Sequence, residues 1–293
     1  GKDVVLTIDS TIQYFAEKIA EIALKEHNAD AVTILVMNPN NGEVLAMANM
    51  PDFNPNKPYE GAESFTGETV AEKVQKMWRN RSVSDSFEPG SIFKIVTASA
   101  ALEEGLAGGD ETYECSGGTH ILGKYVRCWK HGGHGSQTFL EVVQNSCNPG
   151  FVELGNRLGK EKLFDYIYKF GYGKKTGIDL NGESTGILFN LSKVGPVELA
   201  TTAFGQGVSV TALQQVTAVS AAINGGTLYK PYIVKRVVEH ETGQIVNEIK
   251  PTAIRDNIVT KDTSEKVRMT LESVVSLGTG RNAYIDGYRV GGK

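Results

Sequence analysis

Strand-like sequence stands at both ends of this chain, and a long stretch with helical periodicity separates the two groups. The runs that predict strands are residues 4–8, 32–37 and 43–47 near the start, and residues 232–238, 245–249 and 288–293 near the end. An Asn-Gly turn at Asn41-Gly42 joins the second and third runs into a hairpin. One sheet built from both chain ends, with a large helical subdomain inserted, accommodates this order. The predicted fold class is therefore α/β.

The predicted helices lie between these strands. Residues Ser10–Gln13 fit a capping box at the start of the first helix. Its apolar residues fall on one face at helical spacing, at Ile12, Phe15, Ile19 and Ile22. Proline- and polar-rich residues 51–67 predict a loop. Helical patterns then dominate residues 91–222, with a glycine- and histidine-rich interruption at 117–135, and a last helix is predicted at 263–275.

Length and composition indicate which broad classes of protein fit this chain. The chain has 293 residues, of which 40% are hydrophobic and 22% charged, and this length supports a sizeable core. A net charge of −4 gives no basic footprint for nucleic acid. No apolar run approaches the roughly 18 to 20 residues of a membrane span, and no signal peptide is present. We expect residues 1–293 to be one domain that is truncated at both ends.

A serine and a lysine three positions apart follow the turn dipeptide Pro89-Gly90. A helix that starts at Ser91 would place its side chain on the same face as Lys94. Serine becomes a useful nucleophile when a neighbour takes its proton, and burial can lower the pKa of a lysine enough for that task. The helix N-terminus would also stabilise a developing oxyanion. The spacing alone also occurs by chance, in which case Ser91 is a helix cap and Lys94 a solvated side chain.

Two further motifs occur in an informative order. Ser146-Cys147-Asn148 is an S-x-N motif, and the chain closes on Gly291-Gly292-Lys293. S-x-x-K, S-D-N and K-T-G together are the signature of class A β-lactamases and penicillin-binding proteins. Here a cysteine replaces the middle aspartate, and only the lysine of the third motif is visible. Taken singly, Ser146 and Asn148 could be turn or cap residues and Lys293 a surface lysine.

Longer segments extend this similarity over nearly the whole chain. The similar segments are residues 38–47, 87–91, 204–207, 210–214, 278–280 and 288–293. On these residues the chain resembles the transpeptidase domain of class B penicillin-binding proteins. Within that class, Ser146-Cys147-Asn148 and Cys128-Trp129-Lys130 resemble the sporulation-specific (stage V) and elongation-type members. The resemblance implies the fold that penicillin-binding proteins share with serine β-lactamases, with an α/β part of approximately residues 1–85 and 225–293 and a helical part of residues 86–224.

The resemblance also implies an activity, D,D-transpeptidation of peptidoglycan, with no cofactor for catalysis. Ser91 would form an acyl-enzyme with a stem peptide ending in D-Ala-D-Ala and pass it to the amine of a neighbouring stem, and β-lactams would acylate the same serine. Lys94 would accept the serine proton, and Ser146, aided by the charge of Lys293, would relay a proton to the leaving amine. Asn148 would bind a substrate carbonyl and hold Lys94.

The implied location is the outer face of the bacterial cytoplasmic membrane, with an N-terminal anchor helix outside this chain. A cell-wall glycosyltransferase is an implied partner.

Cysteine and histidine cluster between residues 115 and 147, which suggests a zinc site. If Ser146 and Asn148 both face a cleft, the residue between them points elsewhere. We predict a structural zinc held by four ligands, with His131 as the substitute for the histidine: Cys115, Cys128, His134 and Cys147. His134 is preferred because it lies between glycines. A Cys128–Cys147 disulfide and three buried thiols are the alternatives.

Three other functions compete with the transpeptidase. A serine β-lactamase or β-lactam sensor would share the acylation chemistry, but the chain has no Glu-x-x-Leu-Asn segment of the kind class A β-lactamases use to activate water for deacylation. A non-catalytic scaffold in a cell-wall complex would leave the serine silent. A metal-dependent hydrolase is the least favoured, because catalytic zinc usually keeps an open position and a cysteine-rich set is typical of structural zinc.

Overall fold

The fold was analysed in a computed structural model that describes residues 1–293. The α-helices are α1 (Ser10–Glu26), α2 (Val70–Trp78), α3 (Arg81–Ser84), α4 (Lys94–Glu103), α5 (Phe139–Gln144), α6 (Asn148–Lys169), α7 (Pro196–Ala203), α8 (Ala212–Ile223) and α9 (Lys261–Ser276). The strands are β1 (Lys2–Leu6), β2 (Val32–Met37), β3 (Val44–Met50), β4 (Ser86–Phe87), β5 (Thr112–Cys115), β6 (Gly118–Ile121), β7 (Lys124–Arg127), β8 (Gly135–Thr138), β9 (Val210–Thr211), β10 (Leu228–Tyr229), β11 (Val234–Glu239), β12 (Ile245–Glu248) and β13 (Ala253–Arg255).

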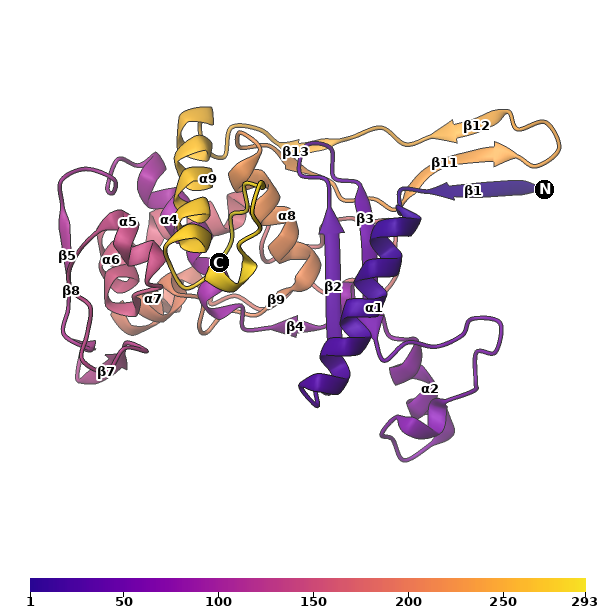
Figure 1. Ribbon diagram of the computed structural model, residues 1–293, viewed down its shortest axis with the longest axis horizontal. Coiled ribbons are helices and arrows are strands. Elements are labelled where there is room, and N and C mark those ends of the chain that lie inside the picture. Colours follow the sequence, from indigo (N-terminus) through magenta and orange to yellow (C-terminus); the bar gives the residue numbers. More distant parts are fainter.

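The two ends of the chain meet in a three-stranded sheet with the order β1-β11-β12. β1 runs antiparallel to β11, from Lys2 opposite Glu239 to Leu6 opposite Val234. These strands extend away from the helical part of the molecule (Figure 1). The hydroxyl of Thr7 donates to the carbonyl of Val44 at 2.6 Å and so ties this sheet to β3. The prediction of a sheet assembled from both chain ends is confirmed.

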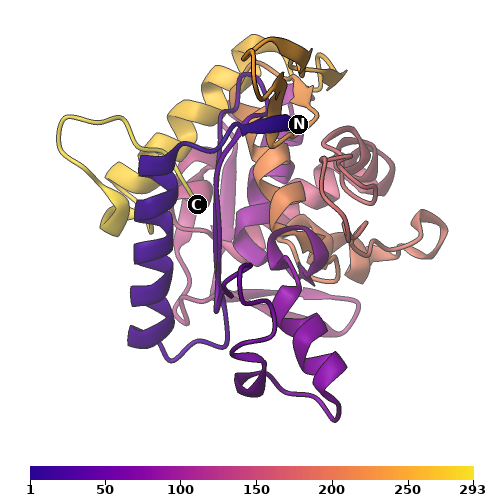
Figure 2. The same cartoon turned by 90° about the vertical axis from the view of Figure 1, so that its right-hand side faces the viewer.

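The β2–β3 hairpin carries α1 on one side (Figure 2). Alanines make the contact and allow a close approach: Ala16 and Ala20 of the helix, and Ala46 and Ala48 of the strand. The predicted turn at Asn41-Gly42 closes the hairpin. Gly42 has φ +80, and a Cβ there would lie 2.6 Å from the carbonyl oxygen of Lys230, so only glycine fits.

The predicted capping box of α1 is wrong by one residue. Asp9 is the N-cap, and its carboxylate accepts from the backbone N–H groups of Thr11 and Ile12. An ionised carboxylate caps a helix as well as serine does. The side chain of Gln13 does not fold back to the cap, because its amide pairs with the backbone of Met47 in β3 at 2.7 Å.

The helix itself is confirmed, but much of its predicted apolar face lies outside the core. Ile12 packs against the alanine cluster, whereas Phe15 and Ile19 are more than half exposed.

The helical part is built around α4, which is buried from Lys94 to Ala101 and contacts α6, α8 and α9. The predicted interruption at residues 117–135 is more ordered than a loop. β6 and β7 form a hairpin inside it, and β5 pairs with β8 beside it. Strands β5, β6 and β7 contact α6.

Residues 288–293 form no strand, so that prediction is wrong. They hydrogen-bond to no neighbouring strand. Instead they lie along α9, where the N–H of Gly292 donates to the carbonyl of Leu271 and Arg289 pairs with Glu272.

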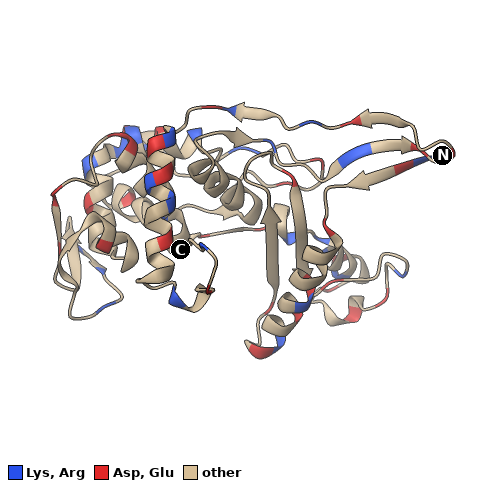
Figure 3. Cartoon of the chain, turned by 45° about the horizontal axis from the view of Figure 1, so that its top comes forward, with Lys and Arg blue, Asp and Glu red and all other residues tan.

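None of the helices has both the length and the apolar character needed to cross a membrane. Acidic and basic residues are interspersed along the chain, notably on α9 (Figure 3).

Candidate active site

Ser91 lies in a tight 3₁₀ turn, Gly90–Phe93, that leads directly into α4. The α-helix therefore begins at Lys94, three residues after the predicted start. A second segment supports the turn: the N–H of Gly90 donates to the carbonyl of Gly205 at 2.9 Å, and β4 pairs with β9. A Cβ on Gly205 would lie 2.0 Å from the carbonyl oxygen of Gly90. The segments 204–207 and 210–214, which resemble the class B family in sequence, thus support the serine turn.

The structure brings Ser91, Lys94, Ser146 and Asn148 together. Lys94 Nζ lies 2.9 Å from the carbonyl oxygen of Ser146, 3.1 Å from its Oγ and 2.7 Å from Asn148 Oδ1. Ser146 Oγ lies 3.2 Å from Ser91 Oγ. No direct hydrogen bond joins Ser91 to Lys94, so the hydroxyl of Ser146 connects them. The amide nitrogen of Asn148 donates to the carbonyl of Arg127 at 2.9 Å, which orients Oδ1 toward the lysine.

The Lys94 amine is enclosed, whereas Ser91 faces solvent. Lys94 is 1% exposed. Burial, followed by the charge of Lys293, lowers the pKa of Lys94 to about 7. Burial removes water from the ammonium form and so favours the neutral amine. A substantial fraction of this side chain is therefore an uncharged base near neutral pH.

Lys293 acts on this group through its charge, since it makes no hydrogen bond to the other four side chains. Burial lowers the pKa of Lys293 to about 8. It lines an apolar groove of about 760 Å³ between α4, α8 and α9. Ser91, Ser146 and Asn148 do not line that groove, so we do not assign it to the substrate.

Ser146 occupies a backbone position that usually belongs to glycine. Its φ is +52, in the left-handed region. The N–H of Ser146 donates to the carbonyl of Val143 and that of Cys147 to the carbonyl of Val142, which together form a Schellman motif at the end of α5. Glycine is favoured there because it has no Cβ. A serine at this site indicates that its hydroxyl is retained at a cost in stability.

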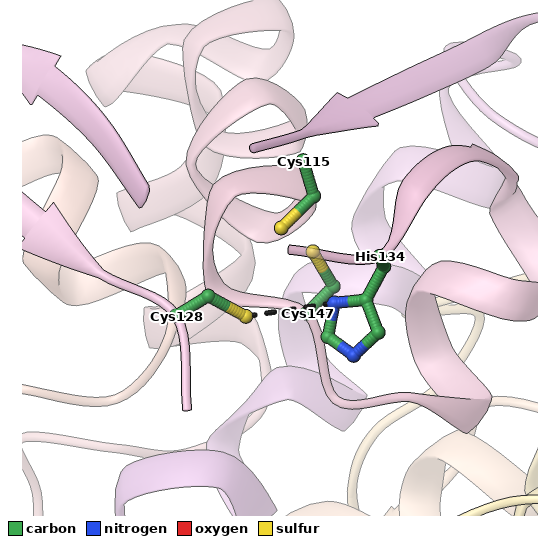
Figure 4. Close-up of side chains that lie close together, drawn as sticks. All are labelled: Cys115, Cys128, His134 and Cys147. Atoms are coloured by element: carbon green, nitrogen blue, oxygen red, sulfur yellow. Dashed lines mark hydrogen bonds between the residues drawn. The ribbon is translucent and has the colours of Figure 1, made fainter. Parts of the chain in front are cut away.

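Four side chains meet on the other side of this loop: Cys115, Cys128, His134 and Cys147. One ligand atom from each lies within 4.8 Å of all the others (Figure 4). The three cysteines are buried free thiols. Cys147 faces this cluster while its neighbours Ser146 and Asn148 face Lys94. His131, the substitute ligand, is exposed and lies outside the cluster.

The donor set fits a zinc ion chemically. Three sulfurs and one imidazole nitrogen are the ligands of closed, tetrahedral structural sites. His134 Nδ1 lies 3.6 Å from Cys128 Sγ, while its Nε2 is buried with no hydrogen-bond partner. The ring nitrogen that faces the sulfurs is therefore the one available to a metal.

Comparison with known proteins identifies the class. Residues 32–293 match the family described as the penicillin binding protein transpeptidase domain. Since this match covers most of the chain, the protein belongs to the penicillin-binding protein transpeptidase family, and its fold is the one shared with β-lactamases.

Individual relatives narrow the comparison. The chain is 53% identical over 295 aligned residues to Stage V sporulation protein D of Bacillus subtilis, with 100% of this chain and 44% of that protein covered. It thus spans less than half the length of that relative. The solved D,D-transpeptidase domain from Eggerthella lenta is 29% identical, with a TM-score of 0.89 over 100% of this chain and 71% of that one. Penicillin binding protein 3 from Mycobacterium tuberculosis, complexed with ampicillin, is 34% identical, with a TM-score of 0.86 over 98% and 62%.

Replacing Ser146 by glycine should separate stability from activity. We expect Ser146→Gly to raise the free energy of unfolding by up to about 1 kcal/mol, because glycine has no steric penalty at this φ. Ser146→Ala should give no such gain, and both variants should react far more slowly with a penicillin. Thermal or urea unfolding and the rate of acylation measure the two effects. A glycine variant no more stable than the alanine variant would contradict the strain argument.

Proposed function

We propose that this chain catalyses acyl transfer between peptidoglycan stem peptides, with Ser91 as nucleophile and Lys94 as base. The observation that carries the proposal is the hydrogen-bonded chain from exposed Ser91 Oγ through Ser146 Oγ to the buried Lys94 amine. The family membership and the relative complexed with ampicillin support the same chemistry.

The contacts of Lys94 orient its lone pair. A neutral amine has two N–H donors and one acceptor site. The carbonyl oxygen of Ser146 and Oδ1 of Asn148 can only accept, so they take the two donors. The lone pair is left facing the hydroxyl of Ser146, which is the partner that can donate.

The reaction follows from this arrangement. As Ser91 Oγ attacks the carbonyl of the penultimate D-Ala, its proton passes to Ser146 Oγ, whose own proton passes to Lys94 Nζ. The backbone N–H of Ser91, at the helix start, would stabilise the oxyanion. Return of the proton along the same route allows the terminal D-Ala to leave as an amine. The ester on Ser91 is then attacked by the amine of a neighbouring stem peptide, which restores the free serine.

Intact mass after exposure to a penicillin tests the nucleophile. The chain, extended past Lys293 to complete the third motif, should gain one stable adduct on the wild type and none on Ser91→Ala. Ser99→Ala is the matched control, because Ser99 is on the same helix but donates only to the carbonyl of Ile95 within it. Rapid loss of the adduct with continued turnover of a chromogenic cephalosporin would indicate a β-lactamase instead. Absence of an adduct on the wild type would favour the silent scaffold.

The acylation rate should depend on pH as a bell-shaped curve. The rate should rise as Lys94 loses its proton near a pKa of about 7 and fall as Lys293 loses its charge near a pKa of about 8. Stopped-flow acylation by a fluorescent penicillin gives the profile. Lys293→Arg should abolish the alkaline limb, because arginine stays charged. A rate that is flat from acid to alkaline pH would refute Lys94 as the base.

We also propose that the Cys115–Cys128–His134–Cys147 cluster holds a structural zinc ion. Its ligand atoms are close enough to share one ion, and four protein ligands leave no position for reacting water. An ion there would fix Cys147 and hence the residues on both sides of it. The role is one of positioning, and no step of the acyl transfer passes through the metal.

Elemental analysis of protein purified without chelator tests the metal site. We expect about one zinc per chain in the wild type and in His131→Ala, and little in His134→Ala. The His131 variant is the control because that histidine is exposed. Mass analysis after alkylation without reductant should find three modifiable thiols once zinc is removed, whereas a Cys128–Cys147 disulfide would leave one. Metal-free wild type that is equally stable and equally reactive would end the proposal.

For the whole protein, we propose a site of action outside the cytoplasmic membrane, where peptidoglycan lies. A membrane anchor and a glycosyltransferase partner are part of this proposal and concern segments other than this chain. The 53% identity to Stage V sporulation protein D favours a role in sporulation over division.

A further inference from the structure

The end of α5 presents backbone carbonyl groups that must find donors, as at every helix C-terminus. Those of Val142 and Val143 are used by the Schellman motif. The carbonyl of Gln144 accepts from Thr279. The carbonyl of Asn145, immediately before Ser146, accepts the indole N–H of Trp129 at 2.7 Å. The last contact therefore comes from the segment that follows β7.

A second side chain holds Asn145 from the same direction. Gln137 of β8 is 3% exposed. Its Oε1 accepts from Asn145 Nδ2 at 3.1 Å, and its Nε2 donates to Cys147 Sγ at 3.3 Å. Trp129 and Gln137 thus fix the residues directly before and after Ser146, although neither touches Ser91 or Lys94.

We infer that Trp129 is a positioning residue of the acyl-transfer site, which holds the left-handed turn at Ser146 through its hydrogen bond to the carbonyl of Asn145. The inference rests on the proposed function. The φ of Ser146 is unfavourable for serine, so the turn must be held by its surroundings. Rotation of the peptide between Asn145 and Ser146 would break the indole hydrogen bond and would carry Ser146 Oγ away from Ser91 and Lys94.

The exposure of Trp129 is consistent with this role. The side chain is 58% exposed, so burial alone gives no reason for such a large apolar group at this position. Its ring meets His134 edge to face with centroids 5.4 Å apart, which fixes the direction of the N–H. The role assigned to Trp129 therefore lies in the donor and its direction rather than in core packing.

The chain supplies a matched control, because it contains only two tryptophans. Trp78 also donates its indole N–H to a backbone carbonyl, that of Pro58, at 2.7 Å and is 42% exposed. It belongs to α2, at the opposite end of the molecule from α5 (Figure 1). Trp78→Phe and Trp129→Phe therefore remove the same kind of hydrogen bond in two places.

The experiment measures acylation by a fluorescent penicillin on the metal-loaded protein extended past Lys293. Saturation kinetics separate the dissociation constant of the penicillin from the rate constant of acylation, and the final stoichiometry counts active molecules. We expect Trp129→Phe to slow the acylation step about tenfold, with an unchanged dissociation constant and full final stoichiometry. Trp78→Phe should match the wild type. Trp129→Ala should be little slower than Trp129→Phe, because the donor is lost in both.

Other outcomes have distinct meanings. A wild type that is never acylated refutes the proposed function itself. If the wild type reacts and Trp129→Phe reacts equally fast, the inference about Trp129 is wrong. A normal Trp129→Phe with a slow Trp129→Ala would show that the ring, not the N–H, matters, and would also overturn it. A third result would also overturn the inference: a slow Trp129→Phe variant whose cysteines are alkylated faster than those of the wild type. The cause of the slow reaction would then be a loosened Cys/His cluster.

Discussion

The Lys94 amine is the group on which the arrangement of the site depends. A lysine that is 1% exposed loses the hydration of its ammonium, and this loss is the first reason its pKa falls to about 7. Its hydrogen-bond partners come from Ser146 and Asn148, more than 50 residues away in the sequence. The amine therefore serves two purposes: it joins α4 to the loop before α6, and it supplies a base beside an exposed serine.

The backbone conformation of Ser146, next to Lys94, is unfavourable for a serine. A glycine at position 146 would relieve the left-handed turn, and the helix end would lose nothing, since the Schellman hydrogen bonds use only backbone atoms. A serine is needed at position 146 only if its hydroxyl has a function. Here the hydroxyl connects Ser91 Oγ to the Lys94 amine. Unfavourable backbone geometry is tolerated where the surroundings overdetermine it. Here the surroundings are Lys94 on one side, and Trp129 and Gln137 on the other.

Sequence reasoning could predict what depends on motif and periodicity. The order of strands and helices, the meeting of both chain ends in one sheet and the helices α1 and α9 followed from such signals. The Cys/His cluster could be anticipated from the clustering of these residues between positions 115 and 147, together with the argument that Cys147 faces away from its neighbours Ser146 and Asn148.

Features that depend on tertiary partners could not be predicted. A strand at 288–293 needs a neighbouring strand, and these residues lie along α9 instead. Gln137 carries no sequence signal of its buried contacts, and the 3₁₀ turn at Ser91 depends on Gly205, which is more than 100 positions away.

The position of Cys147 explains how several separate segments can constrain the loop of Ser146 and Asn148 without hydrogen bonds to Ser91 or Lys94. The residue lies between Ser146 and Asn148 but faces away from Lys94, toward Cys115, Cys128 and His134. A constraint applied there acts on both neighbours through the backbone. Cys128 adjoins Arg127, whose carbonyl orients the Asn148 amide, and Trp129, which holds Asn145. The short segment 127–129 therefore meets three parts of this loop: Trp129 contacts Asn145, Cys128 lies near Cys147, and Arg127 contacts Asn148. A change that moves this segment is expected to move Ser146 and Asn148 together.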